Sequence, residues 1–153
     1  MAFLFYLEVN LVAKKNNDIE NILLKLAKDV TRIADKKVTD EVKEVYRRQV
    51  DFMYEEYTPE YYMRRYCDNG FGDDNNWDVN VMPKSNSVEL ELINETETYN
   101  PSKYRLDKLI EEGMGRLPKE RPVYQRTADE LKSEQVVENT LKSELSKLGY
   151  KFK

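Results

Sequence analysis

The sequence predicts an α+β fold in which a long N-terminal helix and a C-terminal helix pack against a small antiparallel sheet. Residues 18–57 carry apolar side chains at helical spacing, with no proline or glycine among them. Two short alternating segments, 77–81 and 88–92, then flank a turn, and a second helical pattern follows. A chain of 153 residues can bury one compact core, and residues 13–153 are interpreted as a single domain.

The first twelve residues are predicted to form an extended arm or strand. Phe3 and Phe5 begin an alternation of apolar residues that is typical of a strand docked on a sheet edge or on a neighbouring subunit. No basic residue precedes this run, and Glu8 and Asn10 interrupt it. The segment therefore matches neither a signal peptide nor a membrane-spanning helix.

A single long helix is predicted from Asp18, which can cap it, to Tyr54. An unbroken helix of this length would measure about 55 Å. We therefore expect either a kink near Lys36-Lys37 or a first half that packs on a neighbouring subunit. A narrow apolar stripe on such a helix needs a partner surface to cover it. The predicted stripe consists of Ile19, Ile22, Leu23, Leu26, Val30, Ile33, Val38, Val42, Val45, Gln49 and Phe52.

The long helix is predicted to end at Thr58-Pro59, because the residue before a proline is forced out of helical conformations. The hairpin that follows is barely stable alone and needs a third strand or a helical cover, for which residues 61–67 and 150–152 are the candidates. Residues 68–78 are rich in oxygen ligands, but their spacing does not match the calcium loop of an EF-hand. We interpret them as a solvated loop that becomes ordered, if at all, only when subunits assemble.

Two further helices are predicted in the C-terminal third of the chain. Asn100-Pro101 is expected to begin a short helix that Gly113 closes. Thr127 to Glu130 match a capping box and are expected to begin the last helix. Gly149 is expected to end that helix.

The composition argues against an enzyme. The chain has no histidine, which removes the usual general base and the histidine-based triads and zinc sites. Cys67 is the single cysteine, and the five glycines form no phosphate-binding loop. The net charge of -4 gives no reason to expect a nucleic-acid-binding surface. We therefore predict no catalytic, cofactor-binding or metal-binding residues.

Tyrosines and arginines cluster around a proline directly after the long helix, and this cluster has two interpretations. Its side chains could form a contact with another subunit, because tyrosine and arginine carry much of the binding energy of interfaces. They could instead cover the sheet and satisfy their hydroxyls within one subunit, which is the interpretation we favour. The adjacent arginines could contact DNA in a ring lumen, or pair with nearby carboxylates. The candidate interface residues here are Tyr57, Pro59, Tyr61, Tyr62, Arg64 and Arg65, and the extended arm adds Phe3 and Phe5.

Arg121-Pro122 is a second candidate contact. One interpretation is a clamp at an interface between subunits. The other is a rigid lead-in to the last helix, with Arg121 bound to a carboxylate.

The order of four motifs resembles the tail-completion, tail-terminator and head–tail joining proteins of long-tailed bacteriophages. Residues 13–18 lead into the amphipathic helix, and Tyr57-Thr58-Pro59 precedes Tyr62 and Arg64-Arg65. Residues 104–113 and Arg121-Pro122, ahead of a threonine-capped helix, complete the pattern. The resemblance covers roughly residues 14–150, by arrangement of motifs. The chain departs from the pattern where Val123 stands directly after Arg121-Pro122, a place usually held by an aromatic residue.

The resemblance implies a non-enzymatic virion protein, made in the cytoplasm of the bacterial host. Such proteins form rings, commonly six-fold, that terminate the tail tube and join it to the neck of the capsid. The implied partners are further copies of the chain, the major tail tube protein and the neck or connector proteins, with DNA as passing cargo and with no membrane or cofactor. A neck adaptor or stopper is the nearest alternative. A cytosolic interaction module, dimerising through the long helix, is the alternative from another class.

Overall fold

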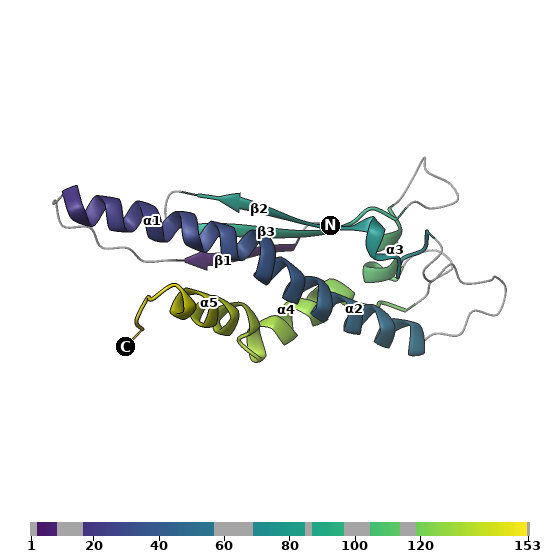
Figure 1. The fold of residues 1–153 in the computed structure, drawn as a ribbon. Coiled ribbons are helices and arrows are strands. Elements are labelled where there is room, and N and C mark those ends of the chain that lie inside the picture. Colours follow the sequence, from purple (N-terminus) through teal and green to yellow (C-terminus); the bar gives the residue numbers. More distant parts are fainter. Residues whose placement is uncertain are drawn as a thin grey trace.

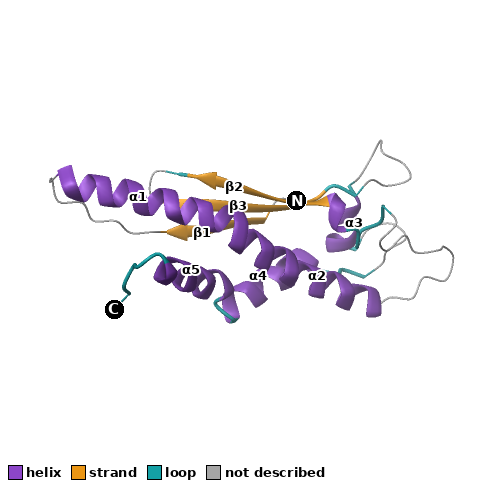
Figure 2. Cartoon of the chain, viewed as in Figure 1, coloured by secondary structure: helices purple, strands orange, loops and turns teal. Residues whose placement is uncertain are grey.

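The computed structural model describes residues 3–8, 17–56, 69–84, 87–96, 105–113 and 119–152. It confirms the predicted α+β fold, with helices packed against a small antiparallel sheet in an elongated molecule (Figure 1; Figure 2). The elements in chain order are β1 (Phe3–Glu8), α1 (Asn17–Ile33), η1 (Ala34–Val38), α2 (Thr39–Glu55), η2 (Asp74–Asn76), β2 (Trp77–Pro83), β3 (Ser87–Asn94), α3 (Leu106–Glu112), α4 (Val123–Ser133) and α5 (Val136–Lys147).

The predicted kink near Lys36-Lys37 is confirmed as η1, a π-helical turn that joins α1 to α2. The backbone N–H and the hydroxyl of Thr39 both donate to the carbonyl of Ala34, five residues earlier. A π turn holds one residue more than an α turn, so it changes which side chains face the core beyond it. The buried positions along α2 are Val42, Val45, Tyr46, Val50 and Met53.

The structure corrects the predicted apolar stripe at both ends, although Val38, Val42 and Val45 at and directly after η1 are buried as predicted. Gln49 is partly exposed and Phe52 is 46% exposed, while the next residue in each case, Val50 and Met53, is buried. At the other end, Ile22 is 60% exposed. Within α2 the buried face passes through Tyr46, Val50 and Met53, so a stripe continued from Val45 to Gln49 and Phe52 leaves it by one residue.

The sheet has the order β1–β3–β2 and is antiparallel throughout. The N-terminal segment supplies the third strand, with Phe5 of β1 and Val81 of β2 both opposite Leu90 of β3. The prediction of a third strand at residues 150–152 is wrong, because Tyr150 instead closes α5 and donates its hydroxyl to Asp29. The other predicted strand, 61–67, lies outside the described residues.

The outer edge of β2 carries its own partners. Asp78 accepts the N–H of Val79 through its side-chain oxygen, 2.9 Å away, and the Lys43 ammonium donates to the carbonyl of Trp77 over 3.0 Å. Alternate residues of a strand direct their backbone groups to the same edge, so Pro83 faces this edge together with Trp77 and Val79. As a proline it has no N–H to donate there. These three features reduce the number of groups that this edge offers to a further strand.

The segment before β2 is ordered against the core, which corrects the prediction of a solvated loop. Phe71 is 2% exposed, and its carbonyl accepts the indole N–H of Trp77 at 2.9 Å. Asp73 accepts the backbone N–H groups of Asn69 and Asn75, which fixes the turn that leads into η2. These described residues need no partner subunit to become ordered.

The C-terminal helices begin at other residues than those predicted. Thr127 lies inside α4 and donates its hydroxyl to the carbonyl of Val123, so the predicted capping box is wrong. Glu111 of α3 supplies the cap instead, because its carboxylate accepts the N–H groups of Tyr124 and Gln125 at 3.1 and 3.2 Å. A cap from a distant segment leaves no local sequence signal.

The predicted helix ends at Gly113 and Gly149 are confirmed. Gly113 follows α3 in the left-handed conformation, with φ of 64°. Gly149 has φ of 91°, and its N–H bonds to the carbonyl of Ser146 while the N–H of Tyr150 bonds to that of Leu145. This is a Schellman motif. The predicted start of the short helix at Asn100-Pro101 lies outside the described residues, and α3 begins at Leu106.

Candidate functional site

A buried polar network joins four elements at one end of the sheet. The side-chain amide of Asn94, at the end of β3, donates to the hydroxyl of Tyr46 on α2 at 3.1 Å. The backbone N–H of Asn94 donates to the hydroxyl of Tyr124 on α4 at 3.0 Å. That hydroxyl in turn donates to Asp107 of α3 at 3.2 Å. The guanidinium of Arg105 closes the network on the same carboxylate at 2.9 Å.

Burial keeps the two tyrosine hydroxyls of this network protonated. It raises the pKa of the Tyr46 hydroxyl well above its ordinary value, and the neighbouring Tyr124 raises it further. Burial and the Asp107 carboxylate raise the pKa of Tyr124 in the same direction. Both phenols therefore stay neutral at physiological pH and serve as hydrogen-bond donors and acceptors. We interpret the network as the joint between α2, α3, α4 and the sheet, because its groups satisfy one another inside the core.

An apolar groove lies at the other end of the sheet, between α1 and the turn end of β2 and β3. It has a volume of about 580 Å³. Leu24, 60% exposed, stands on its helical wall, and Val81 and Pro83 form part of the wall across from it. We call this surface the α1 groove. Its lining is Leu24, Leu26, Ala27, Lys28, Val30, Thr31, Arg32, Asp35, Val81, Pro83, Lys84, Ser87 and Val88.

A second exposed apolar site lies at the end of α2. Phe52 is 46% exposed, and the guanidinium of Arg126 lies over its ring, 4.9 Å from the centroid. Arg126 also pairs with Glu56 at 2.8 Å, and this ion pair lowers the pKa of the Glu56 carboxyl. We call this surface the α2 end. Figure 1 places it at the opposite end of the molecule from the first turns of α1.

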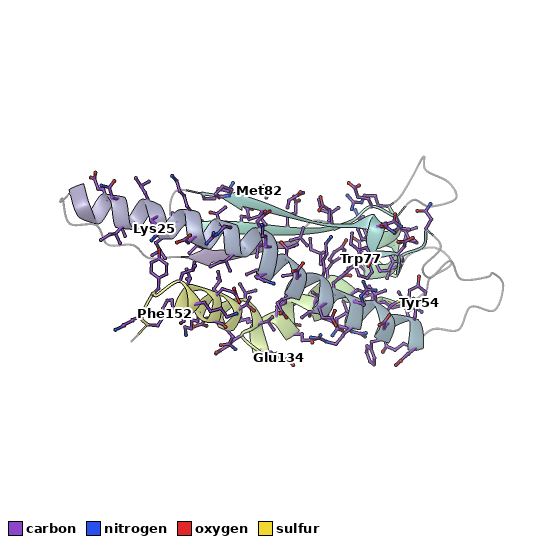
Figure 3. The ribbon with its side chains drawn as sticks, in the orientation of Figure 1. Lys25, Tyr54, Trp77, Met82, Glu134 and Phe152 are labelled. Atoms are coloured by element: carbon purple, nitrogen blue, oxygen red, sulfur yellow. The ribbon has the colours of Figure 1, made fainter. Side chains whose placement is uncertain are left out.

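The side chains in Figure 3 show the contrast between these regions. Trp77 and Tyr54 lie toward the α2 end, where the elements converge, and Lys25 lies on the part of α1 that extends away from them (Figure 3). Apolar surface that remains exposed on a folded subunit commonly marks an interaction site. The α1 groove and the α2 end are therefore the candidate functional surfaces.

The structure describes four of the residues that the sequence predicts as interface residues, namely Phe3, Phe5, Arg121 and Pro122. Phe3 and Phe5 lie in β1, opposite Leu92 and Leu90 of β3. Arg121 is 5% exposed and donates to the carbonyl of Lys119 at 2.9 Å, and Pro122 precedes α4 as its N-cap residue. This placement fits the lead-in interpretation. The remaining candidates lie outside the described residues; they are Tyr57, Pro59, Tyr61, Tyr62, Arg64 and Arg65.

The sequence patterns did not predict the α1 groove or the α2 end as exposed surfaces. Leu24 stands beside the predicted stripe as an apolar residue out of phase, and Phe52 was assigned to the core. An apolar residue out of phase with its helical stripe was the available signal for Leu24. For Phe52 the signal was Met53, an apolar residue directly after it that continues the face of Tyr46 and Val50.

The titratable residues of the described chain form no group of three or more His, Cys, Asp or Glu side chains placed to hold a metal ion. No helix among the described residues has the length and apolar character that crossing a membrane requires. Among the described residues the geometry offers the α1 groove, the exposed Phe52 of the α2 end, the exposed Leu148 and Phe152 after α5, and one internal polar joint.

Comparison with protein families identifies this chain. A family model described as YomN matches residues 16–147. The chain belongs to the YomN family. The match runs from the residue before α1 to the last residue of α5, so it spans the whole helical framework and the β2–β3 hairpin. Neither the curated proteins nor the solved structures contain a significant match.

Proposed function

We propose that this YomN-family chain is a structural virion protein, a ring subunit at the head–tail junction of a tailed bacteriophage. In this role it terminates the tail tube and joins the tube to the neck. Six copies are expected in the ring, with the tail tube protein and the neck proteins on its two faces. DNA crosses its lumen as cargo.

One observation carries this proposal: an elongated subunit exposes apolar surface at both of its ends. The α1 groove lies at one end, and Phe52 marks the other (Figure 1). A subunit of a closed ring must offer two different surfaces, one to each neighbour. The internal polar network supports this role, because it joins the helices and the sheet into a unit that can transmit contacts at either end.

The order of sequence motifs supports the finer assignment to the head–tail junction. A ring around passing DNA also gains from walls that do not bind phosphate strongly, and the net charge of -4 suits such a lumen. The same subunit geometry would serve a neck adaptor or stopper. Position in the particle is what separates these roles.

The first test is the oligomeric state of the purified chain, measured by light scattering over a range of concentrations and by negative-stain imaging. Closed rings of about six copies with a central hole are expected. A clean dimer would favour the alternative of an interaction module that pairs through the long helix.

The second test locates the protein in particles of the phage whose genome encodes it. Gold-labelled antibody is expected at the junction of head and tail, with a few copies per particle by quantitative mass spectrometry. Absence of the protein from purified particles would contradict the proposal. Label on the neck in particles that lack tails would favour the adaptor or stopper role.

A further inference from the structure

We propose that the α1 groove of one copy receives the α2 end of the next copy, with Phe52 inserted between α1 and the β2–β3 turn. This inference rests on the proposed function, because it names the contact that links neighbouring subunits of the ring. The occupant is a second copy of this chain. The argument uses the charge around the groove, the charge around each exposed apolar side chain, and the position of both surfaces.

The rim of the α1 groove presents positive charge. Lys28, Arg32 and Lys84 line it, against one carboxylate, Asp35. Arg32 and Lys84 each form an ion pair with a carboxylate of the same chain, but in both pairs the cation is more exposed than the carboxylate. The side chain of Arg32 is 58% exposed against 16% for its partner Asp29, and that of Lys84 is 55% exposed against 9% for Glu89. An approaching surface therefore meets ammonium and guanidinium groups first.

The described residues offer three large exposed apolar side chains outside the first turns of α1: Phe52, Leu148 and Phe152. Leu148 and Phe152 have lysines as sequence neighbours, Lys147 and Lys151, which would repel the rim of the groove.

Phe52 has the opposite surroundings. Glu55 and Glu56 follow it by three and four residues, which places them beside it on the surface of α2, and Asp51 precedes it. Two arginines are also close to Phe52. Arg126 lies over its ring, 4.9 Å from the centroid, and pairs with Glu56, while Arg48, four residues earlier on α2, pairs with Glu130. Each of these cations is matched by a carboxylate and Glu55 adds another, so the surroundings of Phe52 are acidic on balance and complement the rim of the α1 groove.

The contact pairs two different surfaces of the chain. The α1 groove and the α2 end lie toward opposite ends of one elongated chain, so they cannot meet within it (Figure 1). In a ring each copy uses its groove for one neighbour and its α2 end for the other, whereas an antiparallel pair would use both contacts between the same two copies, and a wild-type species that stops at a dimer would identify that pair. Repetition of such a contact gives a ring when the rotation between copies closes.

The test uses two variants that each lose one of the surfaces. Leu24→Asp puts a carboxylate in the groove, and Phe52→Asp removes the aromatic ring from the α2 end. Leu24 is 60% exposed and Phe52 46% exposed, so thermal unfolding should change little in Leu24→Asp and somewhat more in Phe52→Asp, which also loses the contact of its ring with Arg126. Each variant alone is expected to be monomeric, with association weakened at least tenfold. An equimolar mixture is expected to form a 1:1 heterodimer and nothing larger, because one intact groove meets one intact α2 end.

Phe152→Asp is the matched control, since it makes the same substitution at another exposed phenylalanine. It is expected to assemble like the wild type. A mixture of the first two variants that stays monomeric overturns the contact, as does a Phe152→Asp variant that loses assembly to the same degree. A wild-type chain that remains monomeric at about millimolar concentration by light scattering also overturns it.

The failure of this contact and of the proposed function can be told apart. A protein found at the head–tail junction whose Leu24→Asp and Phe52→Asp variants still form rings refutes the contact alone. Heterodimers from the mixed variants, together with absence of the protein from particles, support the contact and refute the role in the virion.

Discussion

The two ends of the sheet are built in different ways. At the end near Trp77, the ring of Tyr46 meets Trp77 edge-on at 4.9 Å and stacks on Tyr124 at 5.5 Å, while Asn94 joins their hydroxyls and backbone groups. At the turn end, the walls of the α1 groove are largely apolar, and Leu24 remains exposed. One end is closed by mutual hydrogen bonds and aromatic contacts, and the other is left open.

This difference separates stability from association. Buried polar groups that satisfy one another specify one arrangement of the elements around them, since any other arrangement leaves them unpaired. Apolar walls without a cover hold no such arrangement and gain free energy when a partner covers them. Changes at the Trp77 end should therefore lower the free energy of unfolding, and changes at the groove should affect association.

The largest loss of stability is expected from Asn94→Ala. The substitution leaves the hydroxyl of Tyr46, the carbonyl of Phe71 and the N–H of Thr96 without the bonds that Asn94 now makes with them. We expect the free energy of unfolding to fall by about 3 kcal/mol, measured by urea denaturation. The control is Asn80→Ala, which removes one longer bond of 3.4 Å to Glu91 and should cost much less. Equal losses in both variants would contradict the special role of the network.

Gly113→Ala tests the turn that connects α3 to the N-terminus of α4. Gly113 has φ of 64°, and an added Cβ would lie 2.4 Å from the backbone nitrogen of Glu120. Backbone atoms cannot move aside as a side chain can, so we expect a loss well above about 1 kcal/mol. Gly149→Ala is the matched control, because Gly149 has φ of 91° with no atom within 4 Å of an added Cβ. A smaller loss at Gly113 than at Gly149 would refute this account.

Glu111 makes the stability of the network end depend on pH. Burial raises the pKa of its carboxyl, although the N–H groups of Tyr124 and Gln125 oppose the rise. A carboxyl with a raised pKa in the folded state contributes its full stability below the ordinary value of about 4.5, and that contribution is lost as pH rises through the folded-state pKa. The free energy of unfolding of the wild type should therefore fall, relative to Glu111→Gln, as pH rises above about 4.5. Denaturation series from pH 4 to 7 would show a constant difference if the account is wrong.

The smallest effect on stability is expected from Leu24→Ser. Leu24 is 60% exposed, so its loss should change the free energy of unfolding by no more than about 0.5 kcal/mol. Its effect should appear in association, measured by sedimentation at several concentrations. A loss of stability as large as that of Asn94→Ala would show that the groove belongs to the core, and the contrast between the two ends would then fail.

Most of the fold could be predicted from local patterns. The long helix, the hairpin, and the helix ends at Gly113 and Gly149 all leave a signal within a few residues of where they occur. The cap of α4 could not be predicted, because Glu111 reaches it from another helix and Thr127 offers a false match at the expected spacing. Local patterns place the elements, while contacts between distant residues decide their exact ends.

The candidate site was less predictable than the fold. Apolar residues stand at both Phe52 and Met53, and it is Met53 that continues the buried face of Tyr46 and Val50, which leaves Phe52 on the surface. The groove arises where α1 passes the turn end of the hairpin, about sixty residues away in sequence. Asn94 and Asp107 carried no motif, although a buried network needs polar residues at the ends of elements that converge.

The outer edge of β2, where side chains of the same chain occupy some of the backbone groups, affects how readily copies can aggregate during production. A strand edge with free N–H and carbonyl groups is a template on which other chains can add, and crowded, newly made subunits risk forming fibrils by this route. Lys43, Asp78 and Pro83 remove several of those groups from the outer edge of β2. We therefore expect sheet growth from this edge to be less favourable than from a strand that keeps all of its outward groups free.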